Sequence, residues 1–254
     1  MADASALGYA EADPTADVEG YDAAAKAAIL ASIAFHTRVT ADDVYREGIT
    51  KVTPADFESA RALGCTIKLL SICERIVSDD GQERVSARVY PALVPLTHPL
   101  ATVSGAFNAV VVEAEASGRL MFYGQGAGGA PTASAVMGDV VMAARNKVHA
   151  GRGPLESTYA SLPVIAIKDV PTRYYVAMNV LDRPGVLEGV AGEFAKHDVS
   201  IAAVRQEGDG EQTRLVVITH RAPDGALAQT VAALESMEAV TAVSSVLRME
   251  GTDD

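Results

Sequence analysis

Hydrophobic positions in the first third of the chain repeat with the period of an α-helix. The alanine-rich run from Asp22 to Phe35 predicts one long helix. Its larger apolar side chains are expected to form the face that packs on the core: Ile29, Leu30 and Ile33. A short helical turn is expected between Asp13 and Gly20. A second helix is expected between Thr53, as its N-cap, and Gly64, as its C-terminal stop.

The middle of the chain changes to patterns typical of strands. Four runs either alternate between apolar and polar side chains or are apolar throughout: 66–77, 83–94, 107–115 and 118–123. The short turns SDDG and EASG leave no room for helical crossovers, so an antiparallel sheet is predicted. A third long helix is expected over 131–149. A segment rich in Gly, Pro and Ser follows it, and then a short strand over 164–167.

Residues 173–249 follow the order βαββαβ, which is typical of a ferredoxin-like unit. Its predicted strands are 174–181, 200–207, 214–220 and 240–249, and its helices are 186–196 and 227–237. The predicted fold class is therefore α+β, with a helix-flanked, largely antiparallel sheet followed by this unit. Two domains are expected, over residues 1–168 and 173–254.

Composition excludes several classes of partner. The formal net charge of −12 and the lack of any Lys/Arg run argue against binding to nucleic acid or to an anionic membrane surface. No apolar stretch reaches the roughly 18–20 residues of a membrane span, and the N-terminus lacks the features of a signal peptide. Cys65 and Cys73 are interpreted as core residues of a cytoplasmic protein without a disulfide, and the five histidines show no metal-ligand spacing.

Charged side chains are dense near the N-terminus. Six of them fall within one short run: Glu11, Asp13, Asp17, Glu19, Asp22 and Lys26. Asp22 and Lys26 are four residues apart and share one helix face. A lysine among carboxylates can act as a proton donor or acceptor, and acidic groups suit an ammonium substrate. The alternative is a solvated acidic loop that carries an ordinary surface ion pair.

Two glycine-containing turns have the composition of ligand sites. GQGAGG, from Gly124 to Gly129, matches the dinucleotide fingerprint GxGxxG, but it follows an antiparallel meander and lacks the acidic residue expected about 20 positions later. A plain strand-to-helix turn is the alternative. The turn from Asp182 to Leu187 starts a helix and lets the backbone approach a ligand or a partner subunit. His98 lies between prolines, where a structural hydrogen bond is more common than catalysis.

Three blocks in order resemble homoserine dehydrogenase. They are GYAEADPTADVEGYDAAAKAAIL, VPLTHPLATVSGAFNAV and GQGAGGAPTASAVMGDV, which together cover about residues 5–150. The βαββαβ unit with its DRPGVL turn resembles an ACT domain, an amino-acid-sensing module. The resemblance implies interconversion of L-homoserine and L-aspartate 4-semialdehyde with NAD or NADP, on the route to threonine, methionine and isoleucine.

The same resemblance implies roles for individual residues. Lys26 would be the general acid/base. The substrate-binding carboxylates would be Glu11, Asp17 and Asp22. The glycines facing the cofactor would be Gly124, Gly126 and Gly128. The effector, with threonine as the natural candidate, would bind at Asp182, Pro184, Gly185, Val186 and Leu187. The sheet between residues 66 and 123 would build the interface of a homodimer or higher homo-oligomer.

One departure from the family is large. Its members begin with a Rossmann domain, which this sequence does not contain, so the chain by itself is expected to be inactive. The choice between NAD and NADP stays open because the strand end that discriminates them is absent. The alternative belongs to another functional class: the chain would be a non-catalytic module that binds an amino acid or mediates oligomerisation.

Overall fold

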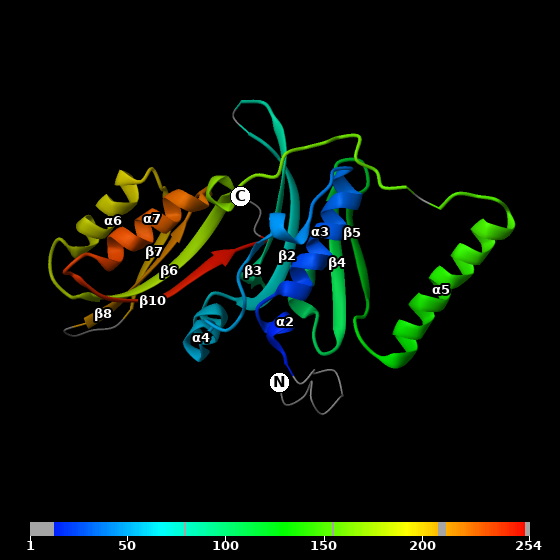
Figure 1. The fold of residues 1–254 in the computed structure, drawn as a ribbon. Helices are drawn as coiled ribbons and strands as arrows, with labels where there is room; N and C mark the ends of the chain where they lie inside the picture. The colour runs from blue at the N-terminus through cyan, green and yellow to red at the C-terminus, as the bar shows by residue number, and fades with distance from the viewer. Residues whose placement is uncertain (1–12, 79, 154, 208–211, 252–254) are drawn as a thin grey trace.

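Strand β3 (Glu83–Pro95) lies at the centre of the computed structural model, which describes residues 13–78, 80–153, 155–207 and 212–251. The antiparallel partner β2 (Cys65–Val77) covers one edge of β3 over its whole length. The other edge therefore takes two parallel partners, β1 (Tyr45–Arg46) and the end of β10 (Val240–Met249). Both halves of the chain thus contribute to a single eight-stranded sheet (Figure 1).

Helix α3 (Tyr21–Phe35) packs on β2 and β3 through its smallest side chains. Its buried residues are all alanines: Ala24, Ala27, Ala28 and Ala31. The prediction that Ile29, Leu30 and Ile33 face the core is wrong, because these side chains are 60%, 39% and 67% exposed. Alanines let the helix axis approach the sheet closely, and the valines of β3 fill the space between them.

Helix α4 (Pro54–Ala62) begins with the predicted cap. The Thr53 hydroxyl accepts a hydrogen bond from the Asp56 amide (3.3 Å), and the Asp56 carboxylate accepts one from the Thr53 amide (2.8 Å). Ala60 of this helix packs in a cluster with residues of the C-terminal strands, including Tyr175 and Leu247. Helix α4 therefore covers one face of the C-terminal part of the sheet.

The C-terminal half has the predicted βαββαβ order. Its elements are β6 (Pro171–Leu181), α6 (Val186–Lys196), β7 (Ile201–Glu207), β8 (Gln212–Thr219), α7 (Asp224–Glu235) and β10, with a short β9 (Ala222–Pro223) before α7. The strand order β10-β6-β8-β7 is that of a ferredoxin-like unit. Val190 and Phe194 of α6 and Leu227 and Leu234 of α7 are buried against the sheet face opposite α4.

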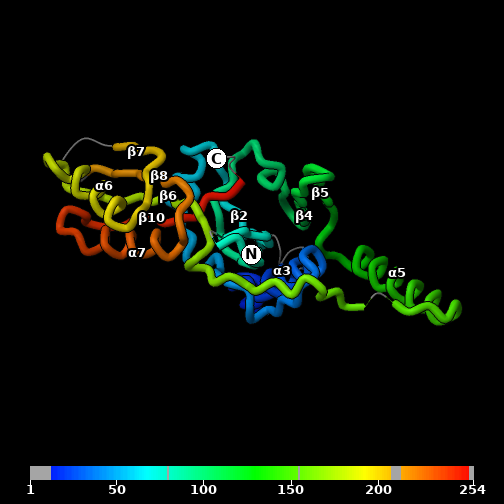
Figure 2. Tube along the Cα trace, turned by 90° about the horizontal axis from the view of Figure 1, so that it is seen from above, coloured from blue at the N-terminus to red at the C-terminus, as the bar shows by residue number. Residues whose placement is uncertain are grey.

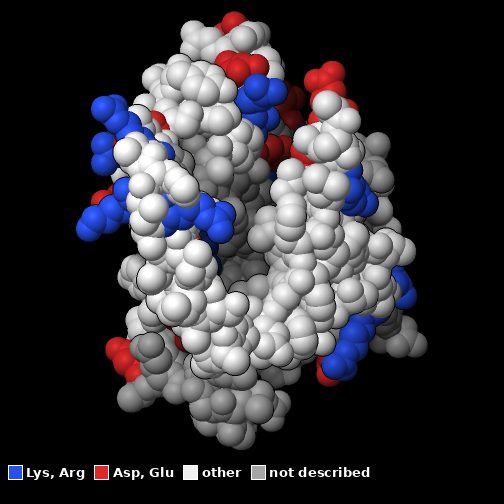
Figure 3. Space-filling model, turned by 90° about the vertical axis from the view of Figure 1, so that its right-hand side faces the viewer, with Lys and Arg blue, Asp and Glu red and all other residues white. Residues whose placement is uncertain are grey.

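Strands β4 (Phe107–Ala114) and β5 (Gly118–Gln125) form a separate antiparallel ladder instead of extending the main sheet. Helix α5 (Gly129–Val148) follows and extends away from the body of the molecule (Figure 2). None of its residues is buried. Figure 3 shows this side of the molecule with a hollow at its centre, largely uncharged surface around the hollow and most charged side chains toward the edges.

Two smaller differences concern the connections. The strand predicted over 164–167 is an isolated bridge between Val164 and Val85, and the 3-10 helix η3 (Ile167–Asp169) follows it. Two further 3-10 helices lie in connections: η1 (Ala41–Asp43) and η2 (Pro99–Thr102).

Both cysteines are free, and burial raises the pKa of the Cys73 thiol to about 11. In the described part of the chain, no helix combines the length and the apolar character of a membrane span.

The close contact between α3 and the sheet predicts that Ala31→Leu is destabilising. Ala31 is fully buried, so the added carbons must displace neighbours, at a cost of about 1–3 kcal/mol in the free energy of unfolding. The same substitution at the exposed Ala25 is the matched control and should change that free energy by less than about 0.5 kcal/mol. Urea denaturation measures both. Equal midpoints for the two variants would contradict this packing.

Candidate active site and effector turn

The charged N-terminal segment folds as a short helix followed by a sharp change of direction. Helix α2 (Thr15–Val18) begins after Asp13, whose carboxylate accepts hydrogen bonds from the amide (3.0 Å) and hydroxyl (2.6 Å) of Thr15. These bonds lower the pKa of Asp13. Gly20 then takes a φ of 77° and becomes the N-cap of α3. A Cβ at Gly20 would lie 3.2 Å from Val89 of β3, so the turn is pressed against the central strand.

Lys26 and Asp22 form an ion pair on the outer face of α3. The Lys26 Nζ donates a hydrogen bond to the Asp22 carboxylate at 2.6 Å, and their side chains are 57% and 49% exposed. The pair points outward because Ala24 and Ala27, at the interleaved positions, face the sheet. Solvent and a small substrate can therefore reach both charged groups.

The other carboxylates of this segment are placed less closely. Asp17 is exposed on α2, and among the described residues no hydrogen bond or ion pair joins it to Asp22 or Lys26. Glu19 is half-buried at the C-cap of α2. Glu11 lies outside the described residues. The structure thus brings together Asp22 and Lys26, with Asp17 in the helix immediately before them.

A second segment, residues 45–49, supports this site, and its role was not predicted from the sequence. The Ile49 amide donates a hydrogen bond to the Val18 carbonyl (2.8 Å), and the Arg46 guanidinium donates one to the Glu19 carbonyl (2.5 Å). A Cβ at Gly48 would lie 2.6 Å from the Val18 carbonyl oxygen. Gly48 is the sequence feature that could have indicated this contact, because glycine permits such a close approach of two backbones.

Arg46 also covers the first residue of α3. Its guanidinium carbon lies 3.5 Å from the centre of the Tyr21 ring, a cation–π contact on an exposed tyrosine. Segment 45–49 therefore contacts both the end of α2 and the start of α3, on either side of the Gly20 turn.

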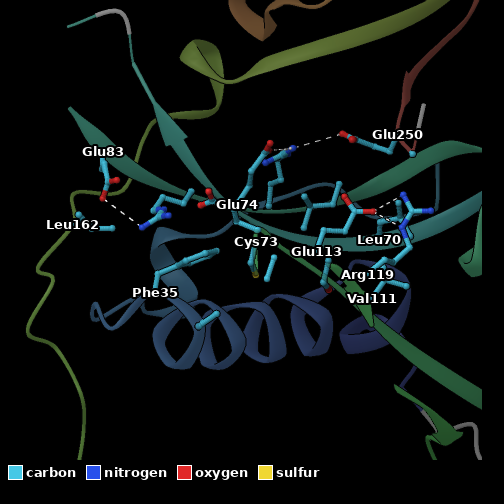
Figure 4. A pocket seen from close by; sticks show the side chains of 18 of the residues that line it. Phe35, Leu70, Cys73, Glu74, Glu83, Val111, Glu113, Arg119, Leu162 and Glu250 are labelled. Atoms are coloured by element: carbon cyan, nitrogen blue, oxygen red, sulfur yellow. Dashed lines mark hydrogen bonds and ion pairs between the residues drawn. The ribbon is translucent and has the colours of Figure 1, made fainter. Parts of the chain in front are cut away.

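A groove of about 1040 Å³ lies between β2, the end of α3 and the β4–β5 hairpin. Figure 4 shows charged side chains around it, among them Glu74 of β2 and the ion pair of Glu113 with Arg119 (2.6 Å) on the hairpin. The residues that line it do not include Asp17, Asp22 or Lys26. The candidate active site is therefore an open surface beside α2 and α3, separate from this groove.

The GQGAGG segment joins an antiparallel strand to α5 and so does not form a parallel βαβ unit. A Cβ at Gly126 would lie 2.2 Å from the Asn108 side chain, so packing within the hairpin accounts for this glycine. Gly128 has a φ of 124°, a conformation that favours glycine, whereas a Cβ at Gly124 would meet open space. The segment therefore lacks the parallel βαβ setting of the dinucleotide fingerprint.

The turn from Asp182 to Leu187 is formed as predicted between β6 and α6. Gly185 has a φ of 89° and is the N-cap of α6. Val186 is buried, whereas Asp182, Pro184 and Leu187 are exposed. Tyr174 lies near the start of β6, eight residues before Asp182. In an extended strand, at about 3.3 Å per residue, this separation is roughly 26 Å. The turn therefore lies at the end of the C-terminal unit that faces away from β3 (Figures 1 and 2).

His98 has a structural role in this structure. It is the N-cap of η2, and its Nδ1 accepts a hydrogen bond from the Leu100 amide (3.3 Å). Within the described ranges, no group of three or more His, Cys, Asp or Glu side chains could hold a metal ion.

These features define an α+β protein with a C-terminal ACT domain, since residues 174–239 match the ACT domain model. Residues 1–141 match the family model for homoserine dehydrogenase. Homoserine dehydrogenase from Mycobacterium tuberculosis is 75% identical over 258 residues, which cover 99% of this chain and 58% of that protein. The chain belongs to the homoserine dehydrogenase family.

Two further comparisons agree. Homoserine dehydrogenase from Corynebacterium glutamicum is 59% identical over 250 residues, covering 98% of this chain and 56% of that protein. The crystal structure of a homoserine dehydrogenase from Thiobacillus denitrificans superposes with a TM-score of 0.87 at 37% identity, covering 98% of this chain and 57% of that one. The chain thus spans under three fifths of the length of these relatives.

The contact of Gly48 with α2 predicts that Gly48→Ala is destabilising. The new methyl group would meet the backbone of Val18 and Glu19, which cannot move without shifting α2, so we expect a loss of about 1–3 kcal/mol. Gly138→Ala on α5 is the matched control, because nothing lies within 4 Å of its added methyl group. This control should be neutral or stabilising by up to about 1 kcal/mol. Urea denaturation distinguishes the two, and an unchanged midpoint for Gly48→Ala would refute the close contact.

Proposed function

We propose that this chain forms the substrate-binding and regulatory portion of a homoserine dehydrogenase that interconverts L-homoserine and L-aspartate 4-semialdehyde. The observation that carries the proposal is the exposed pair of Lys26 and Asp22, in a chain 75% identical to a homoserine dehydrogenase. A lysine ammonium beside a carboxylate on an open surface can meet both the oxygen and the ammonium group of an amino-acid substrate.

In the direction of reduction, the aldehyde carbon gains a hydride and the carbonyl oxygen gains a proton. Lys26 is proposed to donate that proton and to take it back in oxidation, as the general acid/base. Asp22 restrains the lysine through their ion pair (2.6 Å). Asp17 and Glu11 would join Asp22 in binding the substrate's ammonium and hydroxyl groups, because carboxylates accept hydrogen bonds from both.

In this direction NADH or NADPH would supply the hydride, and in oxidation NAD or NADP would accept it. Because the GQGAGG segment does not lie in a parallel βαβ unit, we propose that the cofactor is bound mainly by residues outside those described. Gly124, Gly126 and Gly128 would then only face it. On this proposal the chain alone does not turn over homoserine. The choice between the two cofactors would be made by residues beyond this segment.

The exposed apolar surface favours association of two copies. Strands β4 and β5 carry exposed apolar side chains, which include Phe107, Val112, Leu120, Phe122 and Tyr123. A two-stranded hairpin is marginally stable in water by itself, so a second copy covering these strands would stabilise it. We propose a homodimer or higher homo-oligomer built through this sheet. Such assembly is compatible with the catalytic role and is also what a non-catalytic binding module would show.

The catalytic role of Lys26 is tested by Lys26→Ala in a protein that also contains the cofactor-binding portion. Loss of the proton donor should lower kcat by on the order of a hundredfold or more. Lys51→Ala, an exposed lysine on the neighbouring loop, is the control and should retain kcat. Near-normal turnover of Lys26→Ala would remove Lys26 from this role. Turnover by the 254-residue chain alone would contradict the proposal that the cofactor is bound mainly by residues outside those described.

We further propose that threonine binds at the turn formed by Asp182, Pro184, Gly185, Val186 and Leu187. Backbone N–H groups at the start of α6 can receive the carboxylate of an amino acid. Threonine at a hundredfold excess over its Kd should then stabilise the chain by about 2.7 kcal/mol and raise its Tm. Gly185→Glu should abolish the rise, because it strains the φ of 89° and adds a like charge.

The matched control for the turn is Gly192→Glu on the same helix, where the added Cβ also meets open space. It should keep the threonine-dependent rise in Tm. Thermal unfolding with and without threonine measures both variants. An equal threonine response in Gly185→Glu and in the unmodified chain would place the effector elsewhere.

A further inference from the structure

Arg248, at the end of β10, joins the two halves of the molecule through charged hydrogen bonds. Its Nε donates a hydrogen bond to the carboxylate of Asp224 on α7 (2.8 Å), and its Nη1 donates one to the carboxylate of Glu47 after β1 (2.7 Å). The Arg248 side chain is only 11% exposed and that of Asp224 is 8% exposed. A guanidinium buried to this extent requires both partners, because an unpaired buried charge is strongly destabilising.

Three tyrosine rings enclose the same guanidinium. Its central carbon lies 4.6 Å from the ring centre of Tyr90, 5.4 Å from that of Tyr45 and 5.6 Å from that of Tyr174. These rings come from β3, β1 and β6, so elements of both halves surround one cation. Burial acts to lower the pKa of Arg248, but its hydrogen bond to the Asp224 carboxylate and the surrounding charges hold the pKa above its ordinary value. The charge is therefore permanent.

Glu47 connects this cation to the candidate active site. The Glu47 amide donates a hydrogen bond to Val89 of β3 (2.8 Å). The next two residues are Gly48, which fits closely against Val18 and Glu19, and Ile49, whose amide donates to the Val18 carbonyl. Glu47 binds Arg248, and the backbone of Ile49, two residues later, thus holds the end of α2.

We propose that Arg248 and Glu47 are positioning residues through which the C-terminal half sets the placement of α2 and the start of α3. In this arrangement Arg248 holds Glu47, and segment 45–49 holds the backbone on either side of Gly20. The position of Asp22 and Lys26 then depends on a residue in the last strand of the βαββαβ unit. The catalytic meaning of this coupling rests on the function proposed above, whereas the mechanical coupling itself does not.

A second contact between the halves offers a matched control. Arg214 of β8 donates a hydrogen bond to the Ser59 hydroxyl of α4 (2.6 Å). It crosses the same boundary but reaches neither segment 45–49 nor α2. Loss of Arg214 weakens the junction in general, whereas loss of Arg248 should release one particular segment.

The experiment is amide hydrogen exchange of this chain, followed at the amides of Ile49 and Gly20. Both amides donate to α2, to Val18 and Asp17 respectively. Arg248→Met and Glu47→Gln should each accelerate their exchange by on the order of tenfold, the effect of losing one charged hydrogen bond. Arg214→Met should leave the same two amides within about twofold of the unmodified chain.

Unchanged exchange at Ile49 and Gly20 in Glu47→Gln would overturn the proposal, and so would an equal acceleration in Arg214→Met. Should Arg248→Met fail to fold, Glu47→Gln decides the question, because the Glu47 side chain is 33% exposed and its replacement keeps the shape. The exchange readout does not depend on catalysis. Failure of the Lys26 assay and failure of this coupling are therefore distinguishable.

Discussion

Strand β3 is buried from Val85 to Val94, and its polar side chains can stay there only if the protein supplies their partners. Arg88 is 2% exposed and donates hydrogen bonds to Glu74 (2.9 Å) and to the Tyr90 hydroxyl (2.9 Å). Burial works against its charge, yet the neighbouring Tyr90, Glu250 and Glu74 keep its pKa above the ordinary value. The Tyr90 hydroxyl in turn donates to Glu250, beyond the end of β10.

The partners of β3 therefore come from both halves of the chain. Arg248 and Glu250 alternate with Met249, so the backbone that pairs with β3 also brings a guanidinium to the Tyr90 ring and a carboxylate to its hydroxyl. The parallel pairing of β10 with β3 covers only two residue pairs. It is stabilised chiefly by these side chains and by the apolar cluster around α4. The C-terminal half is thus part of the environment that makes the burial of β3 possible.

Much of the local structure could be predicted because it depends on neighbours in the sequence. Period and turn residues located the C-terminal strands and helices, and Thr53 with Asp56 marked the start of α4. The inward face of α3 was wrongly predicted, because hydrophobicity favours Ile29 and Ile33, whereas the close approach to β3 selects the alanines. Hydrophobic pattern gives the length of such a helix better than its orientation.

Contacts between residues far apart in the sequence could not be predicted from the hydrophobic pattern or from motifs. Glu47 and Arg248 are 201 positions apart, and neither lies in a motif. Strand β1 is two residues long and is defined only by its partner β3. The candidate site combines a local contact that could be predicted with a long-range contact that could not. The i, i+4 spacing predicted the pair of Asp22 and Lys26, but the support from segment 45–49 becomes visible only when β1 is placed beside β3.

Strand β6 joins the proposed effector turn to Asp224, the partner of Arg248. β6 ends at Leu181, directly before the turn, and its first residues contact Asp224, since the Tyr174 hydroxyl (3.0 Å) and the Thr172 hydroxyl (3.2 Å) both donate to that carboxylate. β6 pairs with β8 on one edge and with β10 on the other. Its backbone is therefore hydrogen-bonded on both edges between the proposed effector turn and the contact with Asp224. Asp224 also binds Arg248, and Arg248 binds Glu47. A continuous series of hydrogen-bonded groups thus links the proposed effector turn with segment 45–49.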